Sequence, residues 1–319
     1  MELNQDNNLE PDNQENEDLD YEYSPELEPT MPPAQAAIFG LIAVFLLYQV
    51  GGAVLTLIIF GFDLENANLN GLRLMTAAGQ ILLILAPALI FSKLVYDDVT
   101  TVIRFKLPNK KQVGIFIFGL IILIPLLQSY LYIQNYLFQE LAEASYIINT
   151  IKELLDTLDK FIEETYLQLL TPDSIVDGLI IVFVVSIVPA VSEEVFFRGF
   201  IQKSFELRYR PILAIVITAA FFAAYHFNPY GIIPLFILGL YLGFAVYITD
   251  SIFVAVILHF INNLTAILAF FVFGEEDFVN SAISGDSFST HLVSFSLLLL
   301  VFLSLIYFIR KYNDSLLKE

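Results

Sequence analysis

The stretch IVDGLIIVFVVSIVPAVSEEVFFRGFIQKS, residues 175–204, decides the fold of this chain. A transmembrane helix needs about 20 consecutive apolar residues to cross a hydrocarbon layer roughly 30 Å thick, and this stretch is long enough. It nevertheless contains two adjacent glutamates, Glu193 and Glu194, followed by Arg198. Ionisable side chains inside a membrane span are costly and usually functional. The stretch therefore predicts a membrane helix that carries a functional site.

The rest of the chain is similarly apolar. Its 319 residues are 57% hydrophobic, with a mean hydropathy of +0.72. Lipid offers the backbone no hydrogen-bond partners, so such runs are expected to be helices, and the alternating segments of a β-barrel are not visible. We predict an all-α polytopic membrane protein with about eight transmembrane helices. The expected spans lie near residues 34–61, 73–96, 112–138, 175–204, 211–228, 231–249, 251–273 and 290–310.

Two segments outside these spans differ in composition. Residues 1–31 hold eleven acidic residues and no Lys or Arg, and without them the formal charge of −19 falls to −8. Such a polar, acidic tail is expected to be disordered. Residues 139–171 mix charged residues with apolar ones at helical spacing, which predicts an amphipathic helix or helical hairpin at the membrane surface. The chain has no cysteine, which excludes disulfides and thiolate chemistry, and it has no basic patch for nucleic acid.

The basic residues indicate how the spans are oriented. Cytoplasmic loops of membrane proteins carry an excess of Lys and Arg. With a cytoplasmic N-terminus and alternating spans, only Arg73, Lys152 and Lys160 fall on the far side. The predicted protein is therefore a multi-pass protein of the cell membrane with both termini in the cytoplasm. The cytoplasmic set is Lys93, Arg104, Lys106, Lys110, Lys111, Lys203, Arg208, Arg210, Arg310, Lys311 and Lys318.

Helical geometry separates the two glutamates. Adjacent helical residues project about 100° apart, so both cannot face one pocket. Arg198 follows Glu194 at the favourable i,i+4 distance, which predicts an ion pair and leaves Glu193 free for chemistry. Pro189 lacks an N–H, so the Val185 carbonyl loses its helical partner and a kink is expected just before the glutamates.

Two further spans carry polar residues: His226 lies in one of them, and His259 and Asn263 share a helix face in the other. Counted from the turn between their spans, Glu193 and His226 reach similar depth at about 1.5 Å per residue, whereas His259 is shallower. The count permits a shared site. Such residues also hold neighbouring membrane helices together by hydrogen bonds or line ion pathways in transporters. His291, at the start of the last span, is expected to have no role.

Three motifs carry a family resemblance. Residues 193–198 read EEVFFR, residues 222–226 read FAAYH, and residues 259–263 read HFINN. They resemble, in order and spacing, the EExxxR, FxxxH and HxxxN motifs of the CPBP intramembrane proteases. This family, also called the Abi or CAAX-protease and bacteriocin-processing family, includes type II CAAX prenyl endopeptidases and lysostaphin-resistance-like proteins. The resemblance covers about residues 175–270.

The resemblance implies a membrane-embedded endopeptidase whose general base is the first glutamate, Glu193. We expect Glu193 to activate water with help from His226, and His259 and Asn263 to donate to the oxyanion. The Glu194–Arg198 pair would hold the span in register. We expect no tightly bound cofactor; the alternative is a zinc ion on His226, His259 and Glu193, which would make the protein a metallopeptidase.

The expected organisation follows from these assignments. Residues 1–31 form the acidic tail, 32–138 the first three transmembrane helices, 139–171 the amphipathic segment, 172–275 the catalytic transmembrane core, and 276–319 a loop, the last helix and the C-terminus. The expected partners are the lipid bilayer and a membrane-associated peptide or protein substrate, with a monomer as the default state. The alternatives are a non-proteolytic bacteriocin-immunity or sorting protein and a proton-coupled transporter, although the inverted repeats common in transporters are not visible.

Overall fold

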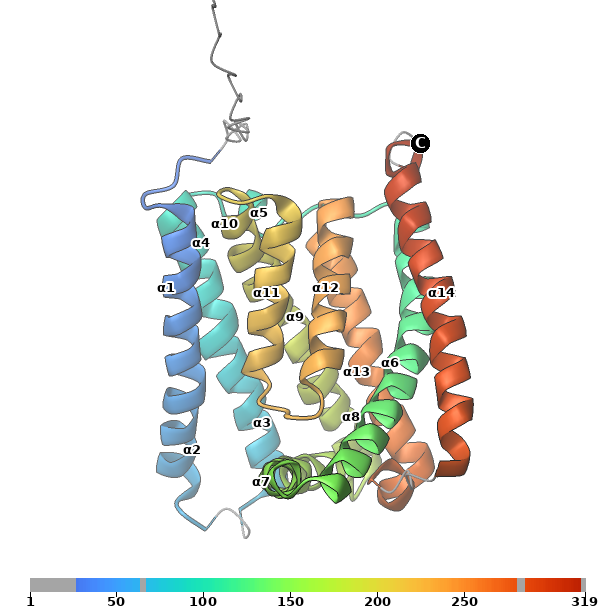
Figure 1. The fold of residues 1–319 in the computed structure, drawn as a ribbon. Coiled ribbons are helices and arrows are strands. Elements are labelled where there is room, and N and C mark those ends of the chain that lie inside the picture. Colours follow the sequence, from blue (N-terminus) through green and yellow to red (C-terminus); the bar gives the residue numbers. More distant parts are fainter. Residues whose placement is uncertain (1–26, 64–66, 280–284, 317–319) are drawn as a thin grey trace, which may run out of the picture.

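The protein is a bundle of long helices that run roughly side by side (Figure 1). The computed structural model describes residues 27–63, 67–279 and 285–316. It contains helices and no strand within these ranges. The predicted all-α fold is therefore confirmed.

Two kinked helices and a short one begin the bundle. Each of these two long helices is interrupted by a π-helical turn, labelled η. Side-chain caps begin the later helices: Asn68 accepts a hydrogen bond from the backbone N–H of Gly71 and starts α3, and Asp98 accepts one from Thr101 and starts α5. The elements are α1 (Pro33–Phe45), η1 (Leu46–Gly51), α2 (Gly52–Phe60), α3 (Leu69–Gln80), η2 (Ile81–Leu85), α4 (Ala86–Tyr96) and α5 (Val99–Val102).

Helix α6 (Lys110–Ala144) then crosses the bundle, and α7 (Tyr146–Leu170) lies across its lower end (Figure 1). Helix α6 ends before Ser145, whose backbone is extended. The expected amphipathic segment 139–171 is therefore not a hairpin. Its first residues continue α6, and the remainder forms one helix.

The central rod follows as one continuous run of helical segments, and four further helices complete the bundle. Pro211 supplies the first residue of α11, a position where the missing N–H costs nothing. The rod comprises α8 (Ile175–Val182), η3 (Phe183–Ile187), α9 (Val188–Glu194), η4 (Val195–Ile201) and α10 (Gln202–Glu206); the later helices are α11 (Pro211–Tyr225), α12 (Ile232–Thr249), α13 (Ile252–Val279) and α14 (Gly285–Leu316).

Seven helices in the described part of the chain are long and apolar enough to cross a membrane. The eighth expected span, α11, has 15 residues, or about 22 Å at 1.5 Å per residue, which is short of a full hydrocarbon layer. It is short because the helix ends at Tyr225 and His226 forms its C-cap. The start of α1 and the end of α14 lie at the same end of the bundle (Figure 1).

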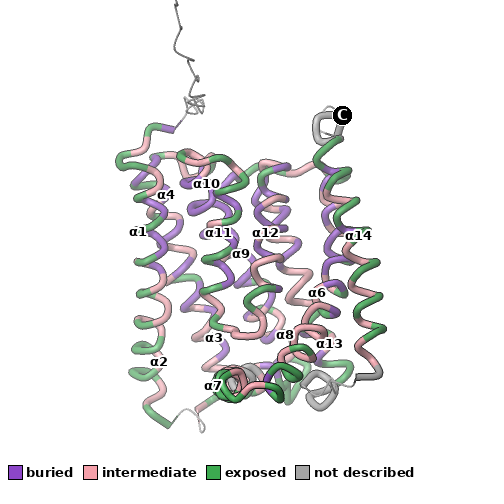
Figure 2. The backbone as a smooth tube through the Cα atoms, in the orientation of Figure 1, coloured by how far each residue is buried: buried purple, intermediate pink, exposed green. Residues whose placement is uncertain are grey.

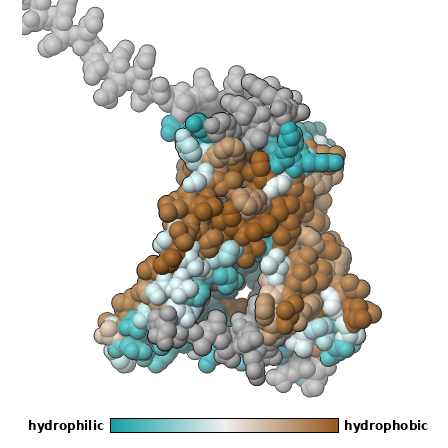
Figure 3. Space-filling view, turned by 90° about the vertical axis from the view of Figure 1, so that its right-hand side faces the viewer, coloured by the Kyte–Doolittle hydropathy of each residue, from teal (hydrophilic) through white to brown (hydrophobic). Residues whose placement is uncertain are grey.

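Burial is concentrated in the central helices, and the outer helices expose apolar side chains (Figure 2). The side of the bundle shown in Figure 3 is hydrophobic across its middle, with hydrophilic surface at its ends and around a hollow in its lower part. The fully buried large side chains include Arg73 and Arg198. Polar groups inside and apolar groups outside are expected of a helical membrane protein.

The end of the predicted acidic tail is part of the fold. Residues 1–26 lie outside the described residues. Leu27, by contrast, is fully buried, and the N–H of Thr30 donates to the carbonyl of Val95 at 2.7 Å. These last residues of the predicted tail therefore pack against the end of α4.

Candidate active site

The central rod is distorted where Pro189 enters it. The π-helical turn η3 precedes Pro189, which occupies one of the first two positions of α9. The carbonyl of Val185, which a regular helix would pair with residue 189, accepts a hydrogen bond of 3.0 Å from the side-chain amide of Asn263. The kink expected from Pro189 is thus a widened turn, and the orphaned carbonyl is satisfied by α13.

Glu194 is the centre of a fully buried polar cluster. Its Oε1 accepts hydrogen bonds of 2.8 Å from Arg198 Nη1 and 2.8 Å from His259 Nδ1. The Glu194 and Arg198 side chains are entirely buried, and Arg198 Nη2 also donates to the carbonyl of Gly239 at 3.3 Å. The predicted ion pair is present. The bond from His259 adds a third helix to it, so this carboxylate joins the central rod to α13.

Glu193 faces His226 on the opposite side. Glu193 Oε2 lies 3.7 Å from His226 Nε2, and the two side chains are 15% and 24% exposed. His226 Nδ1 lies 2.7 Å from the carbonyl of Phe222. A carbonyl only accepts, so Nδ1 carries a proton, and Nε2 is the ring nitrogen that faces Glu193. Glu193 Oε2 makes no hydrogen bond within the described residues.

Phe222 joins the two halves of the site, and sequence reasoning assigned it no role. Its ring centroid lies 4.6 Å from the ring of His226 and 6.0 Å from that of His259. The Arg198 guanidinium carbon lies 4.2 Å from the same centroid, a cation–π contact. The available signal was its position four residues before His226, on the same helix face.

Gly239 lets the helices approach this closely. A Cβ at this position would lie 3.1 Å from the Cα of Ala219 and 3.3 Å from the ring of Phe222. Both distances are tighter than ordinary van der Waals contact, so a larger residue would push α12 away from α11. The same approach brings the carbonyl of Gly239 to Arg198.

A second polar cluster, also not predicted, supports the rod from the end where the termini lie. Arg104 is buried and has a positive φ of 53°. Its Nη1 donates to the backbone carbonyl of Arg198 at 3.3 Å, and its guanidinium pairs with Glu206 and with Asp250. Gln202 donates to Glu206 at 2.8 Å and to the carbonyl of Gly243 at 3.1 Å. This cluster ties the loop before α6 to the rod and to the α12–α13 turn.

The structure brings five of the predicted residues into two adjacent pairings, one around Glu193 and one around Glu194. Asn263 lies one helical turn beyond His259, with its amide bound to the rod. His291 is remote from both pairings and stacks on Tyr132 with ring centroids 3.9 Å apart. No group of three or more His, Asp or Glu side chains among the described residues is placed to hold a metal ion. The arrangement therefore does not fit zinc on His226, His259 and Glu193.

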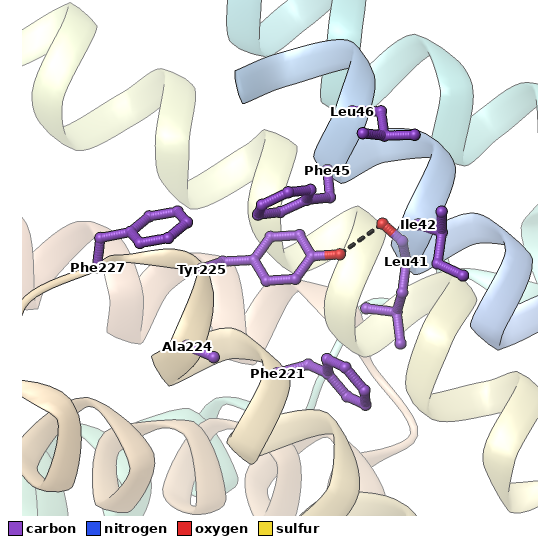
Figure 4. Close-up of a pocket in the computed structure, with 8 residues that line it drawn as sticks. All are labelled: Leu41, Ile42, Phe45, Leu46, Phe221, Ala224, Tyr225 and Phe227. Atoms are coloured by element: carbon purple, nitrogen blue, oxygen red, sulfur yellow. Dashed lines mark hydrogen bonds between the residues drawn. The ribbon is translucent and has the colours of Figure 1, made fainter. Parts of the chain in front are cut away.

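An apolar groove lies beside the polar site, between α1 and α11 (Figure 4). Its volume is about 370 Å³. The Tyr225 hydroxyl donates to the carbonyl of Leu41 at 2.5 Å across it, and Tyr225 and Phe227 flank His226 in the chain. The groove is lined by Leu41, Ile42, Phe45, Leu46, Phe221, Ala224, Tyr225 and Phe227.

The central helices are similar to a known protein family. Residues 175–265 match the model of the type II CAAX prenyl endopeptidase Rce1-like family, and this range contains all three motifs. No curated protein and no solved structure matches the chain. The family is one of CAAX-type intramembrane endopeptidases, so the match supports a membrane protease at this level. Residues 175–265 of this chain thus carry an Rce1-like type II CAAX prenyl endopeptidase domain, consistent with the CPBP family of intramembrane proteases.

Proposed function

We propose that the protein is an intramembrane endopeptidase in which Glu193 is the general base for a water molecule that attacks a peptide bond. The observation that supports this most strongly is the 3.7 Å approach of Glu193 Oε2 to His226 Nε2. When the His226 ring is neutral with its proton at Nδ1, both Nε2 and the Glu193 carboxylate are acceptors. A water molecule has two O–H groups and can donate one to each.

This arrangement leaves the oxygen of that water free to attack. Its lone pairs point away from both acceptors, toward a scissile carbonyl placed against the site. As the carbon–oxygen bond forms, Glu193 takes one water proton. Proton transfer by a positioned side chain contributes typically about 10²–10⁴-fold to a rate. When the tetrahedral intermediate collapses, the carbon–nitrogen bond breaks and that proton goes to the leaving amine.

His259 and Asn263 are the proposed hydrogen-bond donors that stabilise the oxyanion of the intermediate. His259 donates from Nδ1 to Glu194, which leaves Nε2 to face the reaction; Nε2 donates only when the ring is an imidazolium. Asn263 uses one amide N–H on Val185 and has another to donate.

The substrate we propose is a membrane-associated peptide or protein. Seven helices in the described residues are long and apolar enough to cross a membrane, and the site lies within the bundle. We further propose a multi-pass protein of the cell membrane, with both termini cytoplasmic, that acts as a monomer without a tightly bound cofactor.

A substrate trap tests the proposal. Glu193→Gln is expected to abolish cleavage and to leave the fold intact, since Glu193 Oε2 makes no hydrogen bond within the described part of the chain. Membranes from cells that express the variant or the wild type are compared by mass spectrometry for peptides that accumulate uncleaved. A Glu153→Gln variant, at an exposed position on α7, is the matched control. Products identical in wild type and Glu193→Gln would reject the proteolytic role and favour a binding protein.

A further inference from the structure

The loop that carries His226 into α12 has a defined conformation. Phe227, directly after His226, has a positive φ of 51°. Asn228 Oδ1 accepts a hydrogen bond of 2.6 Å from the N–H of Gly231, and a Cβ at Gly231 would come within 2.7 Å of the Asn228 side chain. A residue such as Phe227 adopts this backbone only where its surroundings require it. The orientation of His226 therefore depends on what holds the loop.

Two hydrogen bonds from other helices reach this loop within the described residues, and both are made by Tyr230. The rings of Phe45 on α1 and Phe138 on α6 also lie against Phe227 and Tyr230, with centroids 6.0 and 6.1 Å apart. The Tyr230 hydroxyl donates to Asp156 Oδ1 on α7 at 2.5 Å, and the Tyr230 carbonyl accepts from Gln134 Nε2 on α6 at 3.0 Å. Asp156 also forms an ion pair of 2.7 Å with Lys152, one turn earlier. Burial raises the pKa of the Asp156 carboxyl, but the hydrogen bonds from Lys152 and Tyr230 outweigh it and hold the pKa below its ordinary value. The acceptor is thus an ionised carboxylate, which makes the stronger kind of hydrogen bond.

The polarity of α7 is arranged for this contact. Lys152 and Asp156 lie on the partly buried side of the helix, toward Tyr230. The exposed side carries an apolar stripe at helical spacing: Ile147, Ile151, Leu154, Leu158 and Phe161. A helix that packs by hydrophobic contact alone would turn that stripe toward the bundle. Here α7 instead turns a charged pair inward, toward the loop that follows His226.

We propose that Asp156 and Tyr230 are positioning residues, and that through them α7 holds the loop that sets His226 against Glu193. The catalytic role of this linkage rests on the proposed function. The linkage itself is a statement about the orientation of His226 and can be tested without a substrate. Loss of the hydroxyl–carboxylate bond would remove the link between α7 and the loop, and His226 would sample several orientations.

The chain contains three histidines, so their ring signals can be assigned from single variants. We would record nitrogen NMR spectra of histidine-labelled full-length protein in lipid nanodiscs. Tyr230→Phe and Asp156→Ala are expected to shift or broaden the His226 ring signals and to leave those of His259 and His291 in place. Asp156→Asn retains an acceptor for Tyr230 and is expected to restore the His226 signals. Glu153→Ala, which removes an exposed contact to Asn149 on the same helix, is the control.

Kinetics complete the test where the protease reaction can be followed. A misplacement of about 1 Å can cost on the order of a hundredfold in rate, so we expect Tyr230→Phe to lower kcat by about tenfold or more with little change in KM. Tyr230→Phe with Asp156→Ala together should be no worse than either alone. An unchanged His226 signal in both single variants would overturn the proposal, as would equal changes at His259. These spectra do not depend on turnover, so inactivity of the wild type would count against the proposed function alone.

Discussion

At the residue scale, Glu194 is the acceptor shared by Arg198 and His259, and none of the three has appreciable contact with solvent. Removing one partner of a buried ion pair strands the other charge, which typically costs about 3–5 kcal/mol. Glu193 differs, because its side chain is partly exposed and faces His226 at 3.7 Å. The adjacent glutamates thus differ in what their loss does to the fold.

This difference predicts that a glutamine substitution destabilises the fold at Glu194 and not at Glu193. Glu194→Gln should lower the free energy of unfolding by about 3–5 kcal/mol, because Arg198 loses its counter-charge. Glu193→Gln should leave it unchanged. Thermal unfolding of both variants in the same detergent measures the contrast. Equal midpoints would show that Glu194 does not stabilise the rod.

Asn263 gives a second prediction at this scale. Asn263→Ala removes the donor to the Val185 carbonyl, and an unsatisfied buried carbonyl costs about 1–3 kcal/mol. We expect a lower midpoint of thermal unfolding than in the wild type. Asn262→Ala is the control, because within the described residues the Asn262 amide donates to the side chain of Asn263 and not to the rod. A larger loss in the control would argue against a capping role.

Sequence reasoning could anticipate some of these contacts and not others. Pro189 predicts that the Val185 carbonyl lacks its helical partner, and the spacing of Glu194 and Arg198 predicts their ion pair. Each of these features is local to one helix. The donors Asn263 and His259 come from α13. Which helices pack together depends on close approaches such as that at Gly239, and helical periodicity does not encode them.

At the element scale, α7 combines an exposed apolar stripe with a helix axis that lies across the end of the bundle (Figure 1). We propose that this stripe lies in the interfacial layer of the membrane. Arg73 fixes the C-terminal end of the helix, since its Nε and Nη2 donate to the carbonyls of Leu169 and Thr171. This accounts for a basic residue on the side of the bundle where Lys and Arg are scarce.

The chain has no tryptophan, so a single introduced one reports its own surroundings. Leu158→Trp should emit at short wavelength in lipid nanodiscs and be quenched by brominated acyl chains. Glu153→Trp, at an exposed position on the same helix, should emit at longer wavelength and be quenched less. Equal quenching at the two positions would place α7 away from the lipid.

At the scale of the whole molecule, hydropathy predicted the spans well because each must cover a fixed thickness of lipid. It missed the shortness of α11, since the expected span 211–228 ran past Tyr225, where the helix ends with His226 as its C-cap. It also missed the cluster around Arg104, whose partners Glu206 and Asp250 lie in loops and helix ends far apart in sequence.

The orientation in the membrane can be tested on the same chain, which has no cysteine. We expect Lys110→Cys, at the end of the bundle where the termini lie, to react with a membrane-impermeant maleimide only after cells are permeabilised. Lys160→Cys, on α7, should react in intact cells. The reverse labelling pattern would invert the proposed topology.

The short helix α11 also has a consequence for the surrounding bilayer. Its hydrophobic length of about 22 Å falls short of the acyl region by about 8 Å, while its neighbours have full length. Lipids beside α11 face a hydrophobic mismatch, which membranes relieve by thinning locally. Thinning there would bring the headgroup layer and its water toward His226. The supply of water to the site would then depend on the thickness of the bilayer as well as on the protein.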